Sequence, residues 1–259
     1  MDIKSLVPLL LSLLAGMCTV IGAFIVFFSK SKNKKLICFS LGFSAGVMIT
    51  ISFTDLYITA EENLSKKAGM IGGVLYTLLF LVMGALMALL IDEFIPDVAN
   101  DNKVYDSKNV KLYRVGYVSM IALMIHNFPE GVATFVSGYE NVALGISIAL
   151  AIALHNIPEG ISVAMPIYYS TGSRKEAFKY TFISGIAEPV GAILAWLILK
   201  PFINDTILGV IFALVAGIML YISFAELIPT AREYHYNKIY LFSIFLGICI
   251  MPVSHIFIK

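Results

Sequence analysis

The sequence predicts an all-α integral membrane protein of eight transmembrane helices, arranged as a 3+2+3 inverted repeat with both termini outside. Three observations support this prediction. Hydrophobic residues make up 59% of the chain and charged residues 14%, whereas charged residues approach about a quarter of an ordinary soluble domain. Eight apolar stretches are long enough to span a bilayer, and similar segments recur along the chain. Spanning by helices follows because lipid cannot satisfy exposed backbone groups.

The eight spans follow from length, since a hydrocarbon core needs about 20 apolar residues per helix. Their predicted ranges are about 6–28, 36–60, 69–91, 115–137, 142–168, 177–199, 206–229 and 239–258. We expect the fifth span to kink at Pro158 and Pro166, and the eighth at Pro252, because proline removes a helical hydrogen bond. Lys4 precedes the first span without a small-residue cleavage site, so we expect that span to be retained.

The connectors set the predicted direction of insertion. Those after the first, third, fifth and seventh spans hold 13 of the 18 Lys and Arg residues, and positive connectors face the cytoplasm. Both termini are therefore expected outside the cell membrane. The longest connector, about 92–114, is predicted to be a short cytoplasmic loop, and residues 1–259 form one transmembrane domain.

Several classes of function are excluded by what the sequence lacks. The net charge is +1, which gives no basic footprint for nucleic acid. No phosphate-cradling or dinucleotide-binding glycine pattern occurs, so we expect no nucleotide partner and no prosthetic group. Cys18, Cys38 and Cys249 stand singly in three apolar segments, which predicts buried thiols rather than a disulfide or a thiolate metal site.

An internal repeat relates the second and seventh predicted spans. Residues 45–56, AGVMITISFTDL, match residues 216–227, AGIMLYISFAEL, at seven of twelve positions, and Asp55 corresponds to Glu226. The two spans would cross the membrane in opposite directions, so the repeat is inverted. Inverted repeats that meet on interrupted helices are typical of alternating-access transporters.

A second repeat carries the strongest chemical signal. The segment 126–131, HNFPEG, returns at 155–160 as HNIPEG, on the fourth and fifth spans. Charged groups at the centre of a bilayer cost roughly 2.5 to 3.5 kcal/mol each on insertion scales, so two such sets indicate a functional site rather than packing.

The spacing of each motif gathers its polar side chains. On a helix, His126 and Glu130 are i and i+4, and Asn127 and Glu130 are i and i+3, so all three project toward one side. The second motif repeats this arrangement with three further residues, His155, Asn156 and Glu159. Two imidazoles, two carboxylates and two amide oxygens in one cavity suit Zn²⁺, and also Fe²⁺, Co²⁺ or Mn²⁺.

Other polar groups extend the predicted site. Glu188 precedes Pro189 in the middle of the sixth span, and we expect it to join the same cavity; a protonated Glu bound to backbone is the alternative. Pro129 and Pro158 leave the carbonyls of Ile125 and Leu154 without helical donors. Carboxylates that lie close together in a medium of low dielectric have raised and coupled pKa values, so metal entry is predicted to release protons. Transport is therefore expected to depend on pH.

Weaker candidates lie around this cluster. Asp55 and Glu226 are placed to guide ions in and out, or are simply solvated at the interface. Met48 is a further candidate thioether ligand, although Met in an apolar helix more often packs in the core. His235 and His255 are not expected to be ligands.

These motifs together resemble the ZIP (Zrt/Irt-like) metal transporters. The paired H-N-x-P-E-G segments, the Ala187-Glu188-Pro189 segment and the eight spans carry the resemblance over essentially the whole chain, and the bacterial ZupT/GufA-like branch is the most similar. The resemblance implies inward movement of zinc and often other divalent ions, including cadmium. It also implies an elevator-like or rocking motion within a homodimer.

The resemblance further implies two neighbouring metal positions. One would use His126, Glu130, His155 and Glu159, with Met48 left open as an additional ligand. The other would use Asn127, Glu130, Asn156, Glu159 and Glu188. The connector between the third and fourth spans has no histidine-rich stretch, so regulation by metal bound to that loop is not expected here.

Two other functions compete with metal uptake. An intramembrane zinc hydrolase needs a metal-activated water and a general base, but the motifs lack the H-E-x-x-H pattern that provides them. A proton or organic-ion transporter could use the same carboxylates. Neither metal preference nor proton coupling follows from the sequence, because imidazole and oxygen ligands accept several divalent ions.

Overall fold

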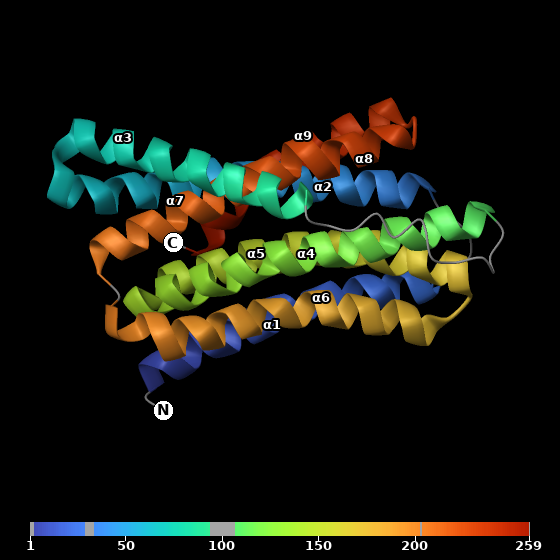
Figure 1. The fold of residues 1–259 in the computed structure, drawn as a ribbon, viewed down its shortest axis with the longest axis horizontal. Helices are drawn as coiled ribbons and strands as arrows, with labels where there is room; N and C mark the ends of the chain where they lie inside the picture. Colours follow the sequence, from blue (N-terminus) through green and yellow to red (C-terminus); the bar gives the residue numbers. More distant parts are fainter. Residues whose placement is uncertain (1–2, 29–33, 94–106, 203, 259) are drawn as a thin grey trace.

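The chain is helical in every part that the structure describes. A computed structural model describes residues 3–28, 34–93, 107–202 and 204–258, and these ranges contain no strand. The predicted all-helical class is thereby confirmed. Figure 1 shows long helices lying roughly side by side along the longest axis of the molecule.

The long helices are interrupted by short π-helical and 3₁₀ segments. The first half of the chain contains α1 (Ile3–Phe28), α2 (Lys34–Ile51), the π-helical η1 (Ser52–Tyr57), α3 (Ile58–Glu93) and α4 (Ser107–Glu140). The second half contains α5 (Val142–Thr171), α6 (Arg174–Leu194), the π-helical η3 (Ala195–Leu199), the 3₁₀ segment η4 (Lys200–Phe202), α7 (Asp205–Ile222), the π-helical η5 (Ser223–Leu227), α8 (Ile228–Glu233) and α9 (Asn237–Ile258).

Glycine at position 69 separates the second and third predicted spans. The helix that starts at α2 continues through η1 into α3 as far as Gly69, whose φ of 72° and ψ of 169° are not helical. An L side chain rarely adopts such a φ, so glycine is suited to this reversal. Beyond it the chain folds back, and Gly73 lies directly against Ser65.

Local sequence explains how several helices begin and end. Asn141 caps α5 by accepting from the backbone N–H groups of Ala143 and Leu144, and Gly172 ends this helix in the left-handed conformation with a φ of 71°. Ser173 then caps α6 by accepting from the N–H of Glu176 at 3.2 Å. Side-chain oxygens at these positions satisfy donors that have no partner within the helix.

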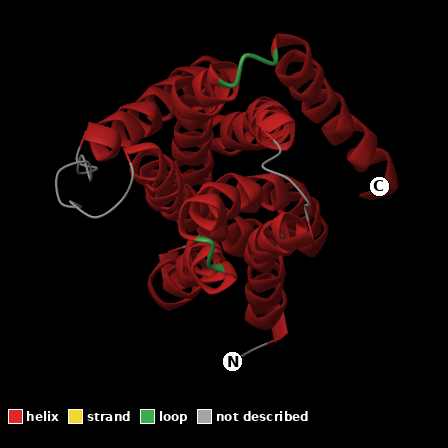
Figure 2. Ribbon diagram, turned by 90° about the vertical axis from the view of Figure 1, so that its right-hand side faces the viewer, coloured by secondary structure: helices red, strands yellow, loops and turns green. Residues whose placement is uncertain are grey.

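The helices pack in two units that do not follow chain order. The first unit, called here the motif unit, consists of α1, α4, α5 and α6, and the second, called here the flanking unit, consists of α2, α3, α7 and α9. The two units meet where α2 contacts α5 and where α4 contacts α7. Figure 2 views the bundle from one end, with the start of the chain on α1 and its end on α9.

The exterior carries the large apolar side chains expected of a membrane protein. Exposed Leu, Ile and Phe side chains occur on α1, α3, α6 and α9, where water would penalise them and hydrocarbon would not. Five of the described helical stretches are long and apolar enough to cross a membrane: Lys4–Phe28, Lys34–Leu90, Val142–Thr171, Arg174–Phe202 and Asp205–Glu233. The full set of eight crossings stays a prediction.

One helix boundary differs from the sequence prediction. α4 begins at Ser107, within the range predicted as a loop, because good helix formers there extend the helix beyond its apolar part. α5 runs as one helical element from Val142 to Thr171 with Pro158 and Pro166 inside it, and the kinks expected at these prolines stay a prediction.

Candidate metal site

Glycines bring together the helices that carry the polar motifs. A Cβ atom at Gly131 of α4 would collide with the carbonyl of Glu188 on α6, and one at Gly160 of α5 would collide with the carbonyl of Thr19 on α1. Only glycine permits backbones to approach this closely, as is common between membrane helices. The motif side chains of α4, α5 and α6 therefore lie in one interior.

Glu130 and His155 form the first pair of this interior. The Glu130 Oε1 atom lies 2.9 Å from the His155 Nε2 atom, and the two side chains are 1% and 0% exposed. The pair joins α4 to α5, as the sequence predicted for the two motifs. The Ser44 hydroxyl on α2 donates to the His155 carbonyl at 3.3 Å, so the flanking unit contacts the site at this residue.

Asn156 and Glu188 form the second pair. The Asn156 Nδ2 group donates to the Glu188 Oε2 atom at 2.9 Å and to the Ala15 carbonyl at 2.9 Å. These bonds connect α5 with both α6 and α1. The structure thus brings Glu188 to the second motif, as predicted from its place beside Pro189.

The two asparagines point their amide oxygens away from their hydrogen-bond partners. The Asn127 Nδ2 group donates to the Ser184 carbonyl at 3.0 Å. Because carbonyls only accept, these contacts fix which end of each amide is the NH₂ group. Asn127 Oδ1 and Asn156 Oδ1 are buried and have no hydrogen-bond partner in the described part of the chain.

The remaining predicted ligands are placed less completely. Glu159 is fully buried on α5 and lies one turn beyond His155. Met48 is also fully buried, one turn beyond Ser44 on α2, which puts it on the side of α2 that faces the site. The side chain of His126 lies outside the described part of α4, as does that of His255 on α9.

The described side chains do not form a closed coordination shell. No group of three or more His, Cys, Asp or Glu side chains is close enough to hold a metal ion among the described residues. The carboxylates instead contact an imidazole and an amide, which offset the cost of burying them.

The predicted peripheral residues lie outside this interior. Asp55 belongs to η1 and Glu226 to η5, and both are partly exposed. The Thr54 hydroxyl donates to the Asp55 Oδ2 atom at 2.6 Å. His235, which is not expected to be a ligand, is exposed in the turn before α9.

Sequence reasoning missed the part that α1 plays in the site. The Ala15 carbonyl accepts from Asn156, and the neighbouring Gly16 lies against Gly185 and Glu188 of α6. Ser44 of α2 was missed as well. The sequence signalled this arrangement only through two glycines, Gly16 on α1 and Gly185 on α6, which let these helices approach closely.

Comparisons with known proteins find a matching family and several similar full-length proteins. A family described as ZIP Zinc transporter matches residues 99–255. The zinc transporter ZupT of Clostridium perfringens is 44% identical to this chain, with 96% of the chain and 95% of the relative covered. That of Streptococcus mutans is 46% identical, with 95% of each covered, and that of Oceanobacillus iheyensis is 45% identical, with 96% and 97% covered.

Proposed function

The chain belongs to the ZIP family of zinc transporters, and from this premise we propose that it moves zinc into the cytoplasm by alternating access through the site on α4, α5 and α6. Family membership places the chain among multi-pass membrane transporters rather than enzymes. The zinc hydrolase considered from the sequence is therefore set aside.

The buried amide oxygens of Asn127 and Asn156 are the observation that carries this proposal. An unpartnered amide oxygen in a membrane protein is costly, yet the described structure contains two, one on each motif. They lie on the helices that also hold the Glu130–His155 pair and the contact of Asn156 with Glu188. Amide oxygens, carboxylates and imidazole together form a donor set that accepts Zn²⁺ and other divalent ions.

The two polar pairs explain how the site can exist without its cargo. A buried carboxylate that lacks a counterpart costs several kcal/mol, and Glu130 and Glu188 each have a hydrogen-bonding neighbour. An arriving cation would take over these carboxylate oxygens and the ring nitrogen of His155. Its departure would let the pairs re-form, so capture and release exchange one set of contacts for another.

The membrane potential supplies the driving force in this proposal. A divalent cation gains about 4.6 kcal/mol per 100 mV of inside-negative potential, at about 2.3 kcal/mol per elementary charge. This gain is sufficient for uphill entry of zinc. We include iron, manganese, cobalt and cadmium as further cargo, because the donor types do not discriminate strongly among these ions.

Alternating access is supported by the inverted repeat. The matching segments of α2 and α7 both lead into π-helical segments, η1 and η5, and both belong to the flanking unit. The motif unit would move against this unit, with Asp55 and Glu226 on the routes in and out. Both termini are proposed to lie outside the cell membrane, and the transporter is proposed to be a homodimer.

Metal influx into sealed proteoliposomes tests the proposal. We expect saturable zinc influx in the wild type and its loss in the isosteric variant Glu130→Gln, which removes a ligand charge. Glu140→Gln, at the exposed end of the same helix, is the matched control and should transport as the wild type does.

Three results would contradict parts of this proposal. Zinc influx at the wild-type rate in Glu130→Gln would show that Glu130 is not a metal ligand. Flux of protons or organic ions that does not depend on metal supports the competing transporter. Folded wild-type protein with no influx of any divalent ion overturns the function itself.

A further inference from the structure

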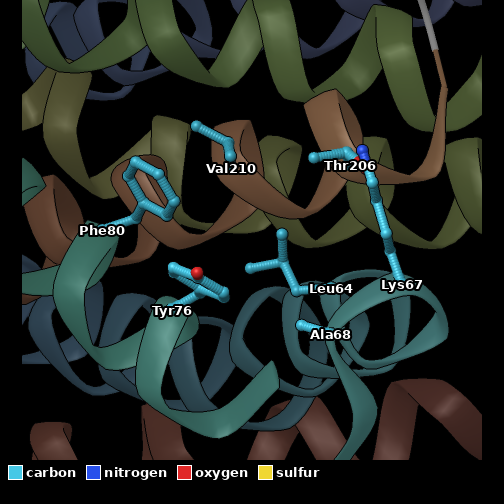
Figure 3. Close-up of a pocket in the computed structure, with 7 residues that line it drawn as sticks. All are labelled: Leu64, Lys67, Ala68, Tyr76, Phe80, Thr206 and Val210. Carbon is cyan, nitrogen blue, oxygen red and sulfur yellow. The ribbon is translucent and has the colours of Figure 1, made fainter. Parts of the chain in front are cut away.

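Two hollows adjoin at the end of the molecule where α3 reverses and α7 begins. The first has a volume of about 410 Å³, which is within the range of small-molecule sites. It is drawn in Figure 3 and is lined by Leu64, Lys67, Ala68, Tyr76, Phe80, Thr206 and Val210. Apart from Lys67 and Thr206, these side chains offer mainly apolar surface.

The second hollow has a different lining. Its volume is about 440 Å³, and its lining residues are Asn63, Lys66, Lys67, Asn204, Asp205 and Thr206. Lys67 and Thr206 line both hollows and therefore mark their boundary. A polar chamber joined to an apolar groove is complementary to an amphiphile, with a charged head and a hydrocarbon tail.

Among the described residues that line the polar chamber, Lys66 is paired and Lys67 is not. Lys66 binds the Asp205 carboxylate at 3.0 Å and the Asn63 amide oxygen at 3.0 Å. Lys67 has no ion-pair or hydrogen-bond partner in the described part of the chain. In Figure 3 its side chain extends from α3 toward Thr206 on α7. An ammonium and a hydroxyl at one boundary suit a phosphate group.

The surroundings of the groove identify where such an amphiphile comes from. Met70, Ile71 and Leu75, at the start of the returning part of α3, are 79%, 77% and 61% exposed, so this surface faces hydrocarbon in a membrane protein. Tyr76 lines the groove near the same end, as aromatic residues do at membrane interfaces. The bilayer itself is therefore the source of the occupant.

We propose that the paired hollows bind one anionic glycerophospholipid of the bilayer. Its phosphate lies at Lys67 and Thr206, its headgroup occupies the polar chamber, and one acyl chain lies in the groove beside Phe80 and Val210. The lipid bridges α3 and α7 where the Gly69 reversal separates the two parts of α3. Its binding stabilises the flanking unit against unfolding.

Lipid-dependent stability tests this inference on the full-length protein. Purified and delipidated protein is titrated with phosphatidylglycerol or phosphatidylcholine, and the thermal midpoint and the lipid retained in native mass spectra are measured. We expect phosphatidylglycerol to raise the midpoint of the wild type and to remain bound. The variant Lys67→Gln should lose at least half of this shift, and phosphatidylcholine should give a smaller one.

Two variants make the result specific. Lys175→Gln removes another exposed lysine, at the start of α6 and at the other end of the molecule from the hollows (Figure 1), and should keep the full shift. Val210→Trp fills the apolar groove and should reduce lipid retention while Lys67 remains. Because Lys67→Gln changes only an exposed side chain, it tests the site even if Val210→Trp fails to fold.

Several outcomes would overturn the inference. An equal shift in Lys67→Gln and the wild type excludes the lysine as the headgroup ligand. Equal stabilisation by glycerol phosphate, which has no acyl chain, excludes a lipid. A doubled mass in place of bound lipid, with the doubling lost in Val210→Trp, would show that a second copy of the chain covers the hollows.

Discussion

The two ends of the Asn156 side chain have different surroundings. Its Nδ2 group holds α5 to Ala15 of α1 and to Glu188 of α6, whereas its Oδ1 atom is buried without a described partner. A purely structural asparagine would be expected to use both ends, because an unsatisfied buried acceptor is costly. We therefore propose a structural role for the Nδ2 group and metal binding for the Oδ1 atom.

Replacing Asn156 with leucine should impair transport more than stability alone would explain. Leucine has a similar size but no oxygen ligand and no N–H donor, so Glu188 also loses its neighbour. We expect kcat/KM for zinc influx to fall about 10- to 100-fold, as it does when groups around a metal are removed. Asn156→Asp, which keeps an oxygen, should retain more influx than Asn156→Leu.

The capping residue Asn141 provides the control for this prediction. Its Oδ1 accepts from the first N–H groups of α5, and it lies outside the candidate site. Asn141→Ala should lower the free energy of unfolding by about 1 kcal/mol and leave influx per folded protein unchanged. Equal losses of influx in both variants would show that Asn156 acts only on the fold.

The polar residues of the candidate site were predictable from the sequence, but the backbone partners of the two asparagines were not. The repeated motif identifies Glu130, His155 and Asn156 because strongly polar groups are rare in apolar spans. The Nδ2 groups of Asn127 and Asn156 donate to the backbone carbonyls of Ser184 and Ala15, and every residue has such a carbonyl. Only the three-dimensional packing selects these two.

At the scale of elements, the internal repeat proves to be a repeat of backbone shape. The π-helical segments begin at Ser52 and Ser223, which are equivalent positions of the repeat. The two serine hydroxyls donate to the carbonyls of Met48 and Met219 at 2.8 and 2.7 Å. A single π-helical turn inside an α-helix is rare and frequently marks a functional site.

Removing one residue from η1 tests whether this shape matters. Deletion of Phe53, which is 50% exposed, should convert the segment to α-helix, because a π-helical turn holds one residue more than an α-helical turn. α3 should then keep its register on α7, whereas Asp55, which lies within the segment, would point in another direction. We therefore expect zinc influx to fall about tenfold or more.

Substitution at the same position separates residue count from side chain. Phe53→Ala keeps the number of residues and changes only an exposed group, so influx should stay close to that of the wild type. Circular dichroism and chromatographic behaviour check that both proteins fold. Full influx in the deletion variant would show that the π-helical turn is dispensable.

The close contact of α4 with α6 gives a second prediction at this scale. A Cβ atom at Gly131 would collide with the Glu188 carbonyl, whereas one at Gly116 of the same helix mainly meets the flexible end of the Ile167 side chain. Gly131→Ala should cost about 1 to 3 kcal/mol, as overpacking does, and should also lower influx by displacing Glu188. Gly116→Ala should cost less; equal thermal midpoints in the two variants would contradict this account.

Hydropathy predicts the cores of the helices better than their ends. The range predicted for the first span, about 6–28, lies within α1, since apolar length is a strong signal. The extension of α4 back to Ser107 leaves the apolar part of the chain, where hydropathy carries no information. The reversal at Gly69 is a single backbone conformation that many other glycines in the sequence could equally have adopted.

At the scale of the whole molecule, the packing units cut across the sequence repeat. The repeat groups the first three spans and the last three, whereas packing places α1 and α6 with the motif helices and leaves α2, α3, α7 and α9 together. Hydrophobic patterning indicates that a helix is buried but not against which neighbour. The partition into units therefore required the structure, although the motifs predicted that α4 and α5 would lie together.

An apolar hollow lies between the two units beside the candidate site. Its volume is about 560 Å³, and it is lined from both units, by Met87 of α3 and Ile218 of α7 on one side and by Phe128, Pro129 and Ala187 on the other. Phe128 and Pro129 adjoin Glu130 in the first motif. If the units move against each other during transport, this space must change shape.

Filling the hollow should therefore slow transport without removing the ligands. The variant Ile218→Trp places a bulky ring in the space, so we expect zinc influx to fall about tenfold, corresponding to roughly 1.4 kcal/mol in the barrier. Zinc binding to the solubilised protein should be retained, because none of the ligand side chains is changed. Leu86→Trp, at a site on α3 that is 50% exposed, is the control and should transport normally. Unchanged influx in Ile218→Trp would mean that the hollow keeps its shape throughout the cycle, whereas parallel loss of binding and influx would mean that the ring disturbs the site itself.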